Sequence, residues 1–358
     1  MRSLNFSAGP AVLPDAVLEQ AQAELLDYQG TGMSIMEQSH RGKSYSEVHQ
    51  AAADNLKSLL AVPAGYSVLF MQGGATGQFA LVPMNLRGAG QVADYTNSGS
   101  WGKKAIAEAK ITGAVHVAAD TGTDLPTCVP EPDALDLSND AAYVHITSNE
   151  TISGAQWKTF PKTKAPLVAD MSSDILSRPL DIADFGLIYA GAQKNLGPAG
   201  VTIVILRDDL ADRAGTDVPA IFRYKTHLEA DSLYNTPPTF SVYLVSLVTA
   251  WLKEQGGLAA MEQKNHAKAT KLYDLMDASS FYKGTAKEAH RSTMNVTFRL
   301  PTEDLEAAFI AAAGEQGMTG LKGHRSVGGI RASIYNAFPE AGVDALVALM
   351  KDFEAKNG

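Results

Sequence analysis

The most informative stretch of the chain reads Phe185-Gly186-Leu187-Ile188-Tyr189-Ala190-Gly191-Ala192-Gln193-Lys194-Asn195-Leu196. Its apolar first half predicts a buried strand, and the turn that follows surrounds one lysine with glycine, alanine and an amide. These small neighbours leave room for a flat ligand beside Lys194. An amine withdrawn from water loses basicity and can attack a carbonyl carbon, as in a Schiff base with pyridoxal phosphate. From this stretch alone, a lysine that merely ends a strand is the alternative.

The composition of the chain restricts the number of domains and the kinds of partner that can be expected. A chain of 358 residues with 45% hydrophobic residues is large enough for two domains. The net charge of -9 argues against nucleic acid as a partner, although local arginines can still bind a small anion. The single cysteine, Cys128, excludes a disulfide framework and a cysteine-rich metal site, so no metal is expected.

Two features of the sequence bear on location. The first residues lack the basic and then apolar pattern of a signal peptide. The most apolar stretch, residues 242–252, is too short to span a bilayer and is predicted to be a buried helix. We therefore expect a soluble cytoplasmic protein.

Strand and helix patterns alternate through the first two thirds of the chain. Helical periodicity at residues 15–28 and 45–60 comes first, and helices are predicted again at 78–86 and 103–110. Seven short apolar runs are predicted strands, at residues 66–71, 91–95, 114–118, 142–146, 167–170, 185–189 and 202–206. This alternation predicts an α/β fold whose mainly parallel seven-stranded sheet is flanked by helices, with ligands beyond the carboxyl ends of the strands.

The last third of the chain predicts a smaller α+β unit. A helical tract from 240 to 273 leads to strands at 294–300 and 330–334 and to helices at 303–316 and 343–355. We expect a large ligand-binding domain over residues 16–256 and a small C-terminal domain over 257–358, with residues 1–15 packing near the small domain.

A pyridoxal phosphate site needs more than a lysine, and candidates for each part are present. Asp170 ends an apolar run 24 positions before Lys194 and can keep a pyridine nitrogen protonated. The turn Gly73-Gly74-Ala75-Thr76-Gly77 opens a helix whose free N–H groups suit a phosphate. Trp101, in a turn of glycine and serine, offers a flat surface for a ring, and Thr151 can bond the ring hydroxyl. Taken singly, each has an ordinary structural explanation in a turn, a cap or the core.

Cations for an anionic substrate occur in two His-Arg pairs and one lone arginine. His40-Arg41 and His324-Arg325 form the pairs, and Arg331 lies inside an apolar strand pattern. A charge in such a place needs a partner, so Arg331 is expected to bind a substrate carboxylate or an internal acid. The two pairs indicate a second anion site, which a phosphorylated substrate would fill.

With these residues in place, the chain resembles the phosphoserine aminotransferase family, class V enzymes of fold type I that use pyridoxal 5′-phosphate. The resemblance covers nearly the whole chain. It is carried by the motifs at residues 5–14, 36–43, 70–79, 148–154, 168–177, 188–200, 234–239 and 323–339, and the last two together are highly specific.

The resemblance implies a role for each of these positions. Lys194 would bind the cofactor and shuttle a proton, Asp170 would hold the pyridinium and Trp101 would stack on the ring. The other cofactor contacts would come from Thr151, Gln193, Ala75 and Thr76, and from Asn235 and Thr236 of a neighbouring subunit in a homodimer. Arg331 would bind the α-carboxylate, and the distal phosphate or carboxylate would be bound by His40, Arg41, His324 and Arg325.

The implied reaction is a reversible ping-pong transamination. L-Glutamate would give its amino group to 3-phosphohydroxypyruvate, yielding 2-oxoglutarate and 3-phospho-L-serine for serine synthesis. Some relatives also act on 4-phosphohydroxythreonine in pyridoxine synthesis. The chain departs from many members at Thr76, where they carry arginine, and at Ala8, where they carry serine. Both departures put the details of substrate binding in doubt.

Three other functions stay open on the sequence. An alanine–glyoxylate aminotransferase would have no use for a second anion site. A cysteine desulfurase would need a mobile nucleophile, for which Cys128 is a poor candidate. A non-catalytic protein that binds phosphorylated metabolites would explain the arginines but leave Lys194, Asp170 and Trp101 without a purpose.

Overall fold

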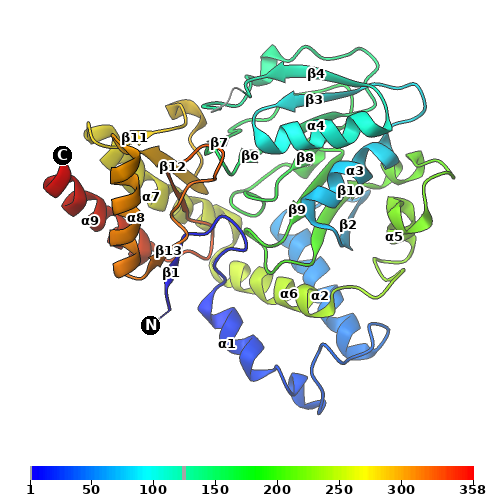
Figure 1. Cartoon of the computed structure of the whole chain (residues 1–358). Helices are drawn as coiled ribbons and strands as arrows, with labels where there is room; N and C mark the ends of the chain where they lie inside the picture. The colour runs from blue at the N-terminus through cyan, green and yellow to red at the C-terminus, as the bar shows by residue number, and fades with distance from the viewer. Residues whose placement is uncertain (1, 123–125) are drawn as a thin grey trace.

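The protein is built around one twisted seven-stranded sheet (Figure 1). The computed structural model describes residues 2–122 and 126–358. β10 runs antiparallel to both of its neighbours, and the other adjacent strands pair in parallel. In sheet order the strands are β2 (Tyr66–Met71), β10 (Thr202–Arg207), β9 (Leu187–Gly191), β8 (Leu167–Asp170), β5 (Val144–Thr147), β3 (Ala93–Asn97) and β4 (Val115–Asp120). The predicted α/β class and mainly parallel sheet are therefore confirmed.

Helices cover both faces of this sheet, which explains why its central strands are apolar throughout. Alternate residues of β9 enter different cores: Ile188 and Ala190 pack on one side, Leu187 and Tyr189 on the other. The first side is covered by α1 (Asp15–Ala23), α2 (Lys43–Leu59) and α6 (Thr239–Glu254), and the second by α3 (Gly74–Leu86), α4 (Ser100–Thr112) and α5 (Tyr224–Glu229).

A second unit with its own core follows in the chain. Its three-stranded antiparallel sheet has β12 (Asn295–Arg299) between β11 (Lys283–Gly284) and β14 (Ile330–Ser333). The helices α7 (Gly257–Ala278), α8 (Glu303–Glu315) and α9 (Glu340–Asn357) pack around it. Near the N-terminus, β1 (Leu4–Asn5) pairs in parallel with β13 (Met318–Thr319) and so joins this unit.

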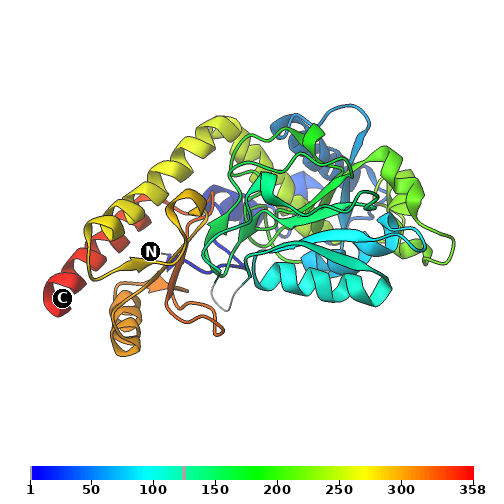
Figure 2. The same ribbon diagram turned by 90° about the horizontal axis from the view of Figure 1, so that it is seen from above.

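α7 connects the two units. Leu258 and Met261 at its start pack in the core of the large sheet, whereas Leu272 and Met276 near its end pack in the second core. Figure 2 shows this helix running outward from the sheet and ending alongside α9. The domain boundary after residue 256 remains a prediction, since one helix serves both cores.

Several predicted elements have different bounds. The helix predicted over 15–28 ends at Ala23, and Leu26, beyond its end, is 85% exposed. The tract predicted as one helix over 240–273 is two helices, because Gly256 and Gly257 adopt left-handed φ angles of 96° and 72° between them. Two short strands, β6 (Asn149–Glu150) and β7 (Ala155–Gln156), had not been predicted.

No helix in the described part of the chain is long and apolar enough to cross a membrane. The predicted buried helix at residues 242–252 lies within α6, where most side chains on the sheet side are buried.

Candidate active site

Lys194 lies in the turn after β9, at the carboxyl edge of the large sheet. Its Nζ donates a hydrogen bond to Thr151 Oγ1 at 2.7 Å and lies 5.1 Å from the centre of the Trp101 ring. Burial lowers the pKa of Lys194, while the carboxyl groups of Asp170 and then Glu150 act in the opposite direction. The structure therefore gathers an acid, a hydroxyl and an aromatic ring around one desolvated amine.

Asp170 is the last residue of β8, the strand next to β9. Its Oδ1 accepts hydrogen bonds from the Ser172 backbone N–H at 2.9 Å and from Ser172 Oγ at 2.6 Å. Ser172 Oγ also accepts from the Gly191 N–H at 3.1 Å, which ties the acid to the turn that carries Lys194. Burial raises the pKa of Asp170, and Lys194 and Ser172 lower it. Oδ2 has no hydrogen-bond partner among the described residues and is available to a ligand N–H.

Trp101 lies in the first turn of α4 rather than in the loop before it. The ammonium of Lys104 lies 4.5 Å from the centre of its ring. Its indole Nε1 is buried, and no described group accepts its hydrogen. The ring is thus oriented by the helix and by contacts with its faces, as a stacking surface requires.

Ala75 and Thr76 form the first turn of α3 after Gly73 and Gly74, whose φ angles of 96° and 64° turn the chain into the helix. No side chain caps this helix. The amides of Ala75 and Thr76 have no intrahelical acceptor and no other partner among the described residues, which leaves them for an anion.

The N-terminal segment closes over the other side of the lysine. The Ala11 N–H donates to the carbonyl of Gln193 at 2.9 Å. Gly9 packs so closely that a Cβ there would lie 3.1 Å from Lys194 Cγ. Ala8 meets the second unit through its carbonyl, which accepts a hydrogen bond from Tyr335 Oη at 2.7 Å. The N-terminal segment thus packs against the turn that carries Gln193 and Lys194.

Arg331 is the charged residue that β14 brings toward this site. It forms no ion pair with any residue that the structure describes, and its Nε is buried without a hydrogen-bond partner. Burial lowers its pKa. Burial lowers the pKa of His324, and the charges of Arg331 and Arg325 lower it further, so His324 lies close to Arg331. Among the described residues no internal acid partners Arg331, so a ligand carboxylate remains as its partner.

Four predicted residues are not brought to Lys194 within one chain. His40 and Arg41 lie in the turn before α2 and make no hydrogen bond or ion pair with the described site residues; His40 Nε2 is buried without a partner, and Arg41 is exposed. Asn235 and Thr236 are also exposed, in the loop before α6, where the Thr236 carbonyl accepts a hydrogen bond from Gln72 Nε2 at 3.3 Å. Asn235 and Gly73 line a common cavity of about 250 Å³.

Glu150 also lies at this site, although no role was predicted for it from the sequence. It is fully buried at the end of β6, directly before Thr151, and its charge acts on Lys194. Nothing in the local pattern distinguishes it from a turn acid, so only the three-dimensional structure finds it.

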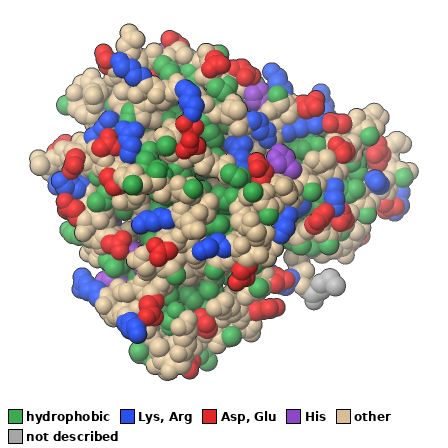
Figure 3. Space-filling model, turned by 180° about the vertical axis from the view of Figure 1, so that it is seen from behind, with side chains coloured by type: hydrophobic (Ala, Val, Ile, Leu, Met, Phe, Trp, Pro, Cys, Tyr) green, Lys and Arg blue, Asp and Glu red, His purple; other side chains and the backbone are tan. Residues whose placement is uncertain are grey.

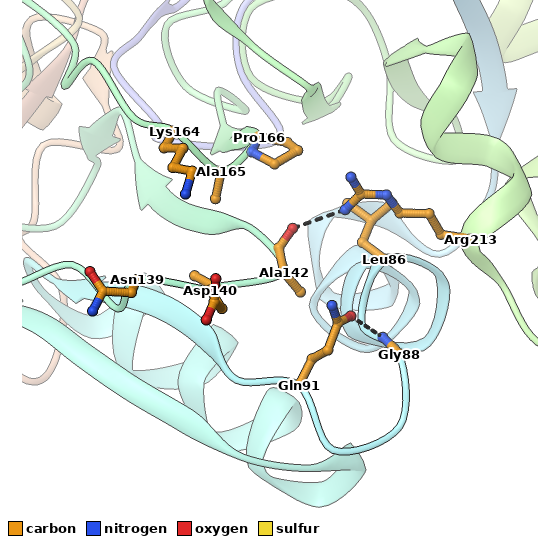
Figure 4. A pocket seen from close by; sticks show the side chains of 11 residues that line it. Leu86, Gly88, Gln91, Asn139, Asp140, Ala142, Lys164, Ala165, Pro166 and Arg213 are labelled. Atoms are coloured by element: carbon orange, nitrogen blue, oxygen red, sulfur yellow. Dashed lines mark hydrogen bonds between the residues drawn. The ribbon is translucent and has the colours of Figure 1, made fainter.

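A polar cavity of about 560 Å³ lies elsewhere, at the amino end of the strands (Figure 4). Arg213 points into it but already donates to the Ala142 carbonyl at 2.9 Å, and Gln91 Oε1 accepts from the Gly88 N–H at 2.8 Å. These two side chains are thus already paired within the protein, and the cavity contains no counterpart of the desolvated lysine. The candidate active site is therefore the one around Lys194.

Comparison with known proteins gives consistent matches over the whole chain. The family described as aminotransferase class-V matches residues 3–346. The chain is 55% identical to a phosphoserine aminotransferase of Geobacillus kaustophilus over 356 residues, covering 99% of both proteins. It is also 55% identical to a phosphoserine aminotransferase of Nitrosomonas europaea, over 99% of this chain and 98% of that protein.

Solved structures agree. The phosphoserine aminotransferase of Bacillus circulans subsp. alkalophilus superposes with a TM-score of 0.98 at 53% identity, over 100% of this chain and 99% of that one. The pyridoxal-phosphate-bound phosphoserine aminotransferase of Trichomonas vaginalis gives 0.94 at 41% identity, over 98% and 100%. An alanine–glyoxylate aminotransferase of Nostoc sp. gives 0.77 at 15% identity over 99% and 96%, and shares the fold alone.

Because Arg331 has no ion-pair partner among the described residues, we expect that replacing it will not lower the free energy of unfolding. Arg331→Met should leave the free energy of unfolding unchanged or raise it by about 1 kcal/mol, because a buried charge without a partner is removed. Arg299→Met, on the neighbouring strand, is the matched control. Arg299 pairs with the buried Glu306, so its loss should lower the free energy of unfolding by about 1–3 kcal/mol. Urea unfolding of both variants measures this, and an equal loss in both would show that Arg331 serves the fold.

Proposed function

The chain belongs to the phosphoserine aminotransferases of the class-V aminotransferase family, and we propose that the transamination between L-glutamate and 3-phosphohydroxypyruvate takes place at Lys194. The observation that carries this proposal is the desolvated Lys194 amine, bonded to Thr151 at 2.7 Å with Asp170 at the end of the adjacent strand. No other described lysine combines a lowered pKa with an acid, a hydroxyl and an aromatic ring.

The residues present fit pyridoxal phosphate, the cofactor of this family. Among the described residues, Asp170 Oδ2 has no hydrogen-bond partner and the first turn of α3 has N–H groups without an acceptor. Trp101 offers a partly buried ring. When bound, the cofactor supplies an aldehyde that condenses with amines and a protonated ring that accepts electrons from the bond that breaks. Asp170 would hold the proton on the ring nitrogen, and Thr151 and Gln193 would bond ring substituents. Ala75 and Thr76 would donate their amides to the phosphate.

Lys194 would have two tasks in each half-reaction. Its amine would hold the cofactor in the resting enzyme, and when a substrate is bound its Nζ would move the proton at the substrate Cα. The Thr151 hydroxyl orients Nζ for this transfer. Burial favours the uncharged amine, the form that can accept a proton.

Substrate recognition would follow from the two kinds of cation. Arg331 would bind the α-carboxylate that glutamate and 3-phosphohydroxypyruvate share. The distal group, a carboxylate in one substrate and a phosphate in the other, would be bound by the His-Arg pairs 324–325 and 40–41. In ping-pong order the same cations serve both substrates in turn.

A homodimer would complete the site. Large apolar side chains are exposed at Leu26, Met36, Phe222 and Tyr234, with exposed fractions of 85%, 51%, 44% and 49%. Figure 3 shows hydrophobic side chains gathered toward the lower part of the face opposite to that of Figure 1. Since His40 and Arg41 do not reach Lys194 within one chain, this proposal assigns them, with Asn235 and Thr236, to the site of the partner. A cytoplasmic location stays the prediction made from the sequence.

Replacing Lys194 tests the assignment of the cofactor lysine. Lys194→Ala should remove the visible absorbance of the covalently bound cofactor and reduce kcat by at least a thousandfold, because attachment and proton transfer are both lost. Lys268→Met is the control: it removes another buried amine, which bonds only backbone carbonyls. Retention of the visible band in Lys194→Ala would assign the cofactor to another lysine.

Comparing two acceptors tests the phosphate site. Hydroxypyruvate lacks the phosphate and forfeits charge-assisted hydrogen bonds of about 1.5–3 kcal/mol each. We expect kcat/KM for hydroxypyruvate to be at least a hundredfold below that for 3-phosphohydroxypyruvate in a coupled assay of 2-oxoglutarate. Similar values for the two acceptors would contradict a dedicated phosphate site.

Mixing two inactive variants tests the shared site. Lys194→Ala and Arg41→Met should each be poorly active alone. When they are co-expressed, half of the dimers are mixed, and each mixed dimer holds one site with neither substitution, so about a quarter of wild-type activity should return. Recovery no greater than the sum of the two variants would place Arg41 in its own chain's site or outside the site altogether.

A further inference from the structure

Glu150 is an ionisable side chain at the site that the mechanism above does not use. It is fully buried, and Ser98 Oγ donates a hydrogen bond to its Oε1 at 3.0 Å. The backbone N–H of Gly102 also stabilises its charged form. Ser98 and Gly102 flank Trp101, so this carboxyl group contacts both ends of the turn that carries the stacking ring.

The turn lies directly against the carboxyl group. A Cβ added to Gly99 would come within 2.7 Å of Glu150 Oε2, a separation that only glycine permits. Gly99 precedes α4, and no side chain of the turn itself caps this helix. The carboxyl group of Glu150 therefore lies against the start of α4, where a negative charge stabilises the first turn of a helix.

The second carboxyl oxygen of Glu150 lies against Gly99. Glu150 Oε2 is buried and accepts no hydrogen bond from any residue that the structure describes. Together with Lys103 and Ser326, Glu150 lines a cavity of about 290 Å³ between α4 and the loop before β14. The other charges that act on Glu150 are Asp170 at the end of β8 and Lys194 after β9.

The charge of Glu150 and the proton on Lys194 are linked. Burial raises the pKa of Glu150 to about 7, while the bonds from Ser98 and Gly102 and the charge of Lys194 lower it. In return, Glu150 is the second carboxyl group, after Asp170, that raises the pKa of Lys194. Asp170 is expected to pair with the ring nitrogen, which leaves Glu150 as the carboxylate free to respond to the lysine.

We propose that Glu150 is a positioning residue for the transamination: one oxygen fixes the turn that carries Trp101, and the carboxylate supplies a buried negative charge that keeps a proton on the Lys194 nitrogen. The inference rests on the proposed function only in taking Lys194 as the residue that binds the cofactor. It requires nothing of the substrate.

Glu150→Gln separates the two roles. The amide keeps the size of the side chain and an oxygen that accepts from Ser98, but it carries no charge. The measurement is a pH titration of the visible absorbance of the substrate-free holoenzyme, which changes when the lysine nitrogen bound to the cofactor loses its proton. Without the carboxylate the proton should leave at lower pH, so the midpoint should fall by about 0.5–1 pH unit, a three- to tenfold increase in the acid dissociation constant.

Ser98→Ala is the matched control, because it keeps the carboxyl group and removes one bond that stabilises its charged form. It should lower the midpoint by less than Glu150→Gln does and weaken the visible circular dichroism of the bound ring, which reports on ring orientation. Glu150→Gln should preserve this dichroism. If Glu150→Gln does not fold, Glu150→Asp keeps the charge at a greater distance and should lower the midpoint by a smaller amount.

An unchanged midpoint in Glu150→Gln, or in Glu150→Asp where that variant is used, overturns the role of the charge. Unchanged dichroism in Ser98→Ala overturns the role in fixing the turn. These results are distinct from failure of the proposed function, since an enzyme with another substrate would still show both effects, and a cofactor on another lysine is revealed by Lys194→Ala.

Discussion

The structure depends on holding one amine out of water beside a carboxylate that is itself buried. Burying either charge alone would cost free energy. Burial lowers the pKa of Lys194 and raises that of Asp170, so it favours the neutral form of each. Asp170 and Lys194 can share this position because β8 and β9 are parallel neighbours that end at the same edge of the sheet. Ser172 then links the two strand ends, since it donates to Asp170 and accepts from Gly191.

Hydrogen bonds between the two units fix the position of Arg331 relative to Asp170 and Lys194. Asn336, shortly after β14, accepts a hydrogen bond at its Oδ1 from Asn265 at 2.8 Å, while its own N–H donates to Asn195 Oδ1 at 3.0 Å. Asn195 is the residue after Lys194. These hydrogen bonds join the turn that carries Lys194 to the segment that follows β14, the strand of Arg331. They therefore hold the two units together near Lys194 and Arg331.

The sequence predicted the parts that have a local pattern. Apolar runs that end in glycine-rich turns gave the seven strands, and Lys194, Asp170 and Trp101 could be chosen because each follows or opens such an element. Glu150 could not be found, because its importance comes from burial beneath Gly99, a contact between segments about fifty residues apart. The break between α6 and α7 was missed although two adjacent glycines mark it, because the apolar periodicity continues on either side. The end of α1 was missed because Leu25 and Leu26 continue the helical pattern after the helix has ended.

The residues proposed to act from a partner subunit could not be identified from local patterns in the sequence. The motifs at residues 36–43 and 323–339 both carry the family resemblance, yet only the second lies near Lys194 within one chain. Contacts between protomers leave no periodic signal that assigns a residue to its own site or to that of a partner. Arg41, Asn235 and Thr236 are exposed in the single chain, as the proposed dimer requires.

The central claim is that the desolvated amine of Lys194 binds the cofactor. Borohydride reduction of the holoenzyme, followed by peptide mapping with mass spectrometry, tests it most directly. The account predicts one pyridoxyl phosphate label per chain, on the peptide that contains Lys194. A label on Lys158 or Lys268, the other described lysines whose pKa burial lowers, to about 8 and about 7, would contradict it.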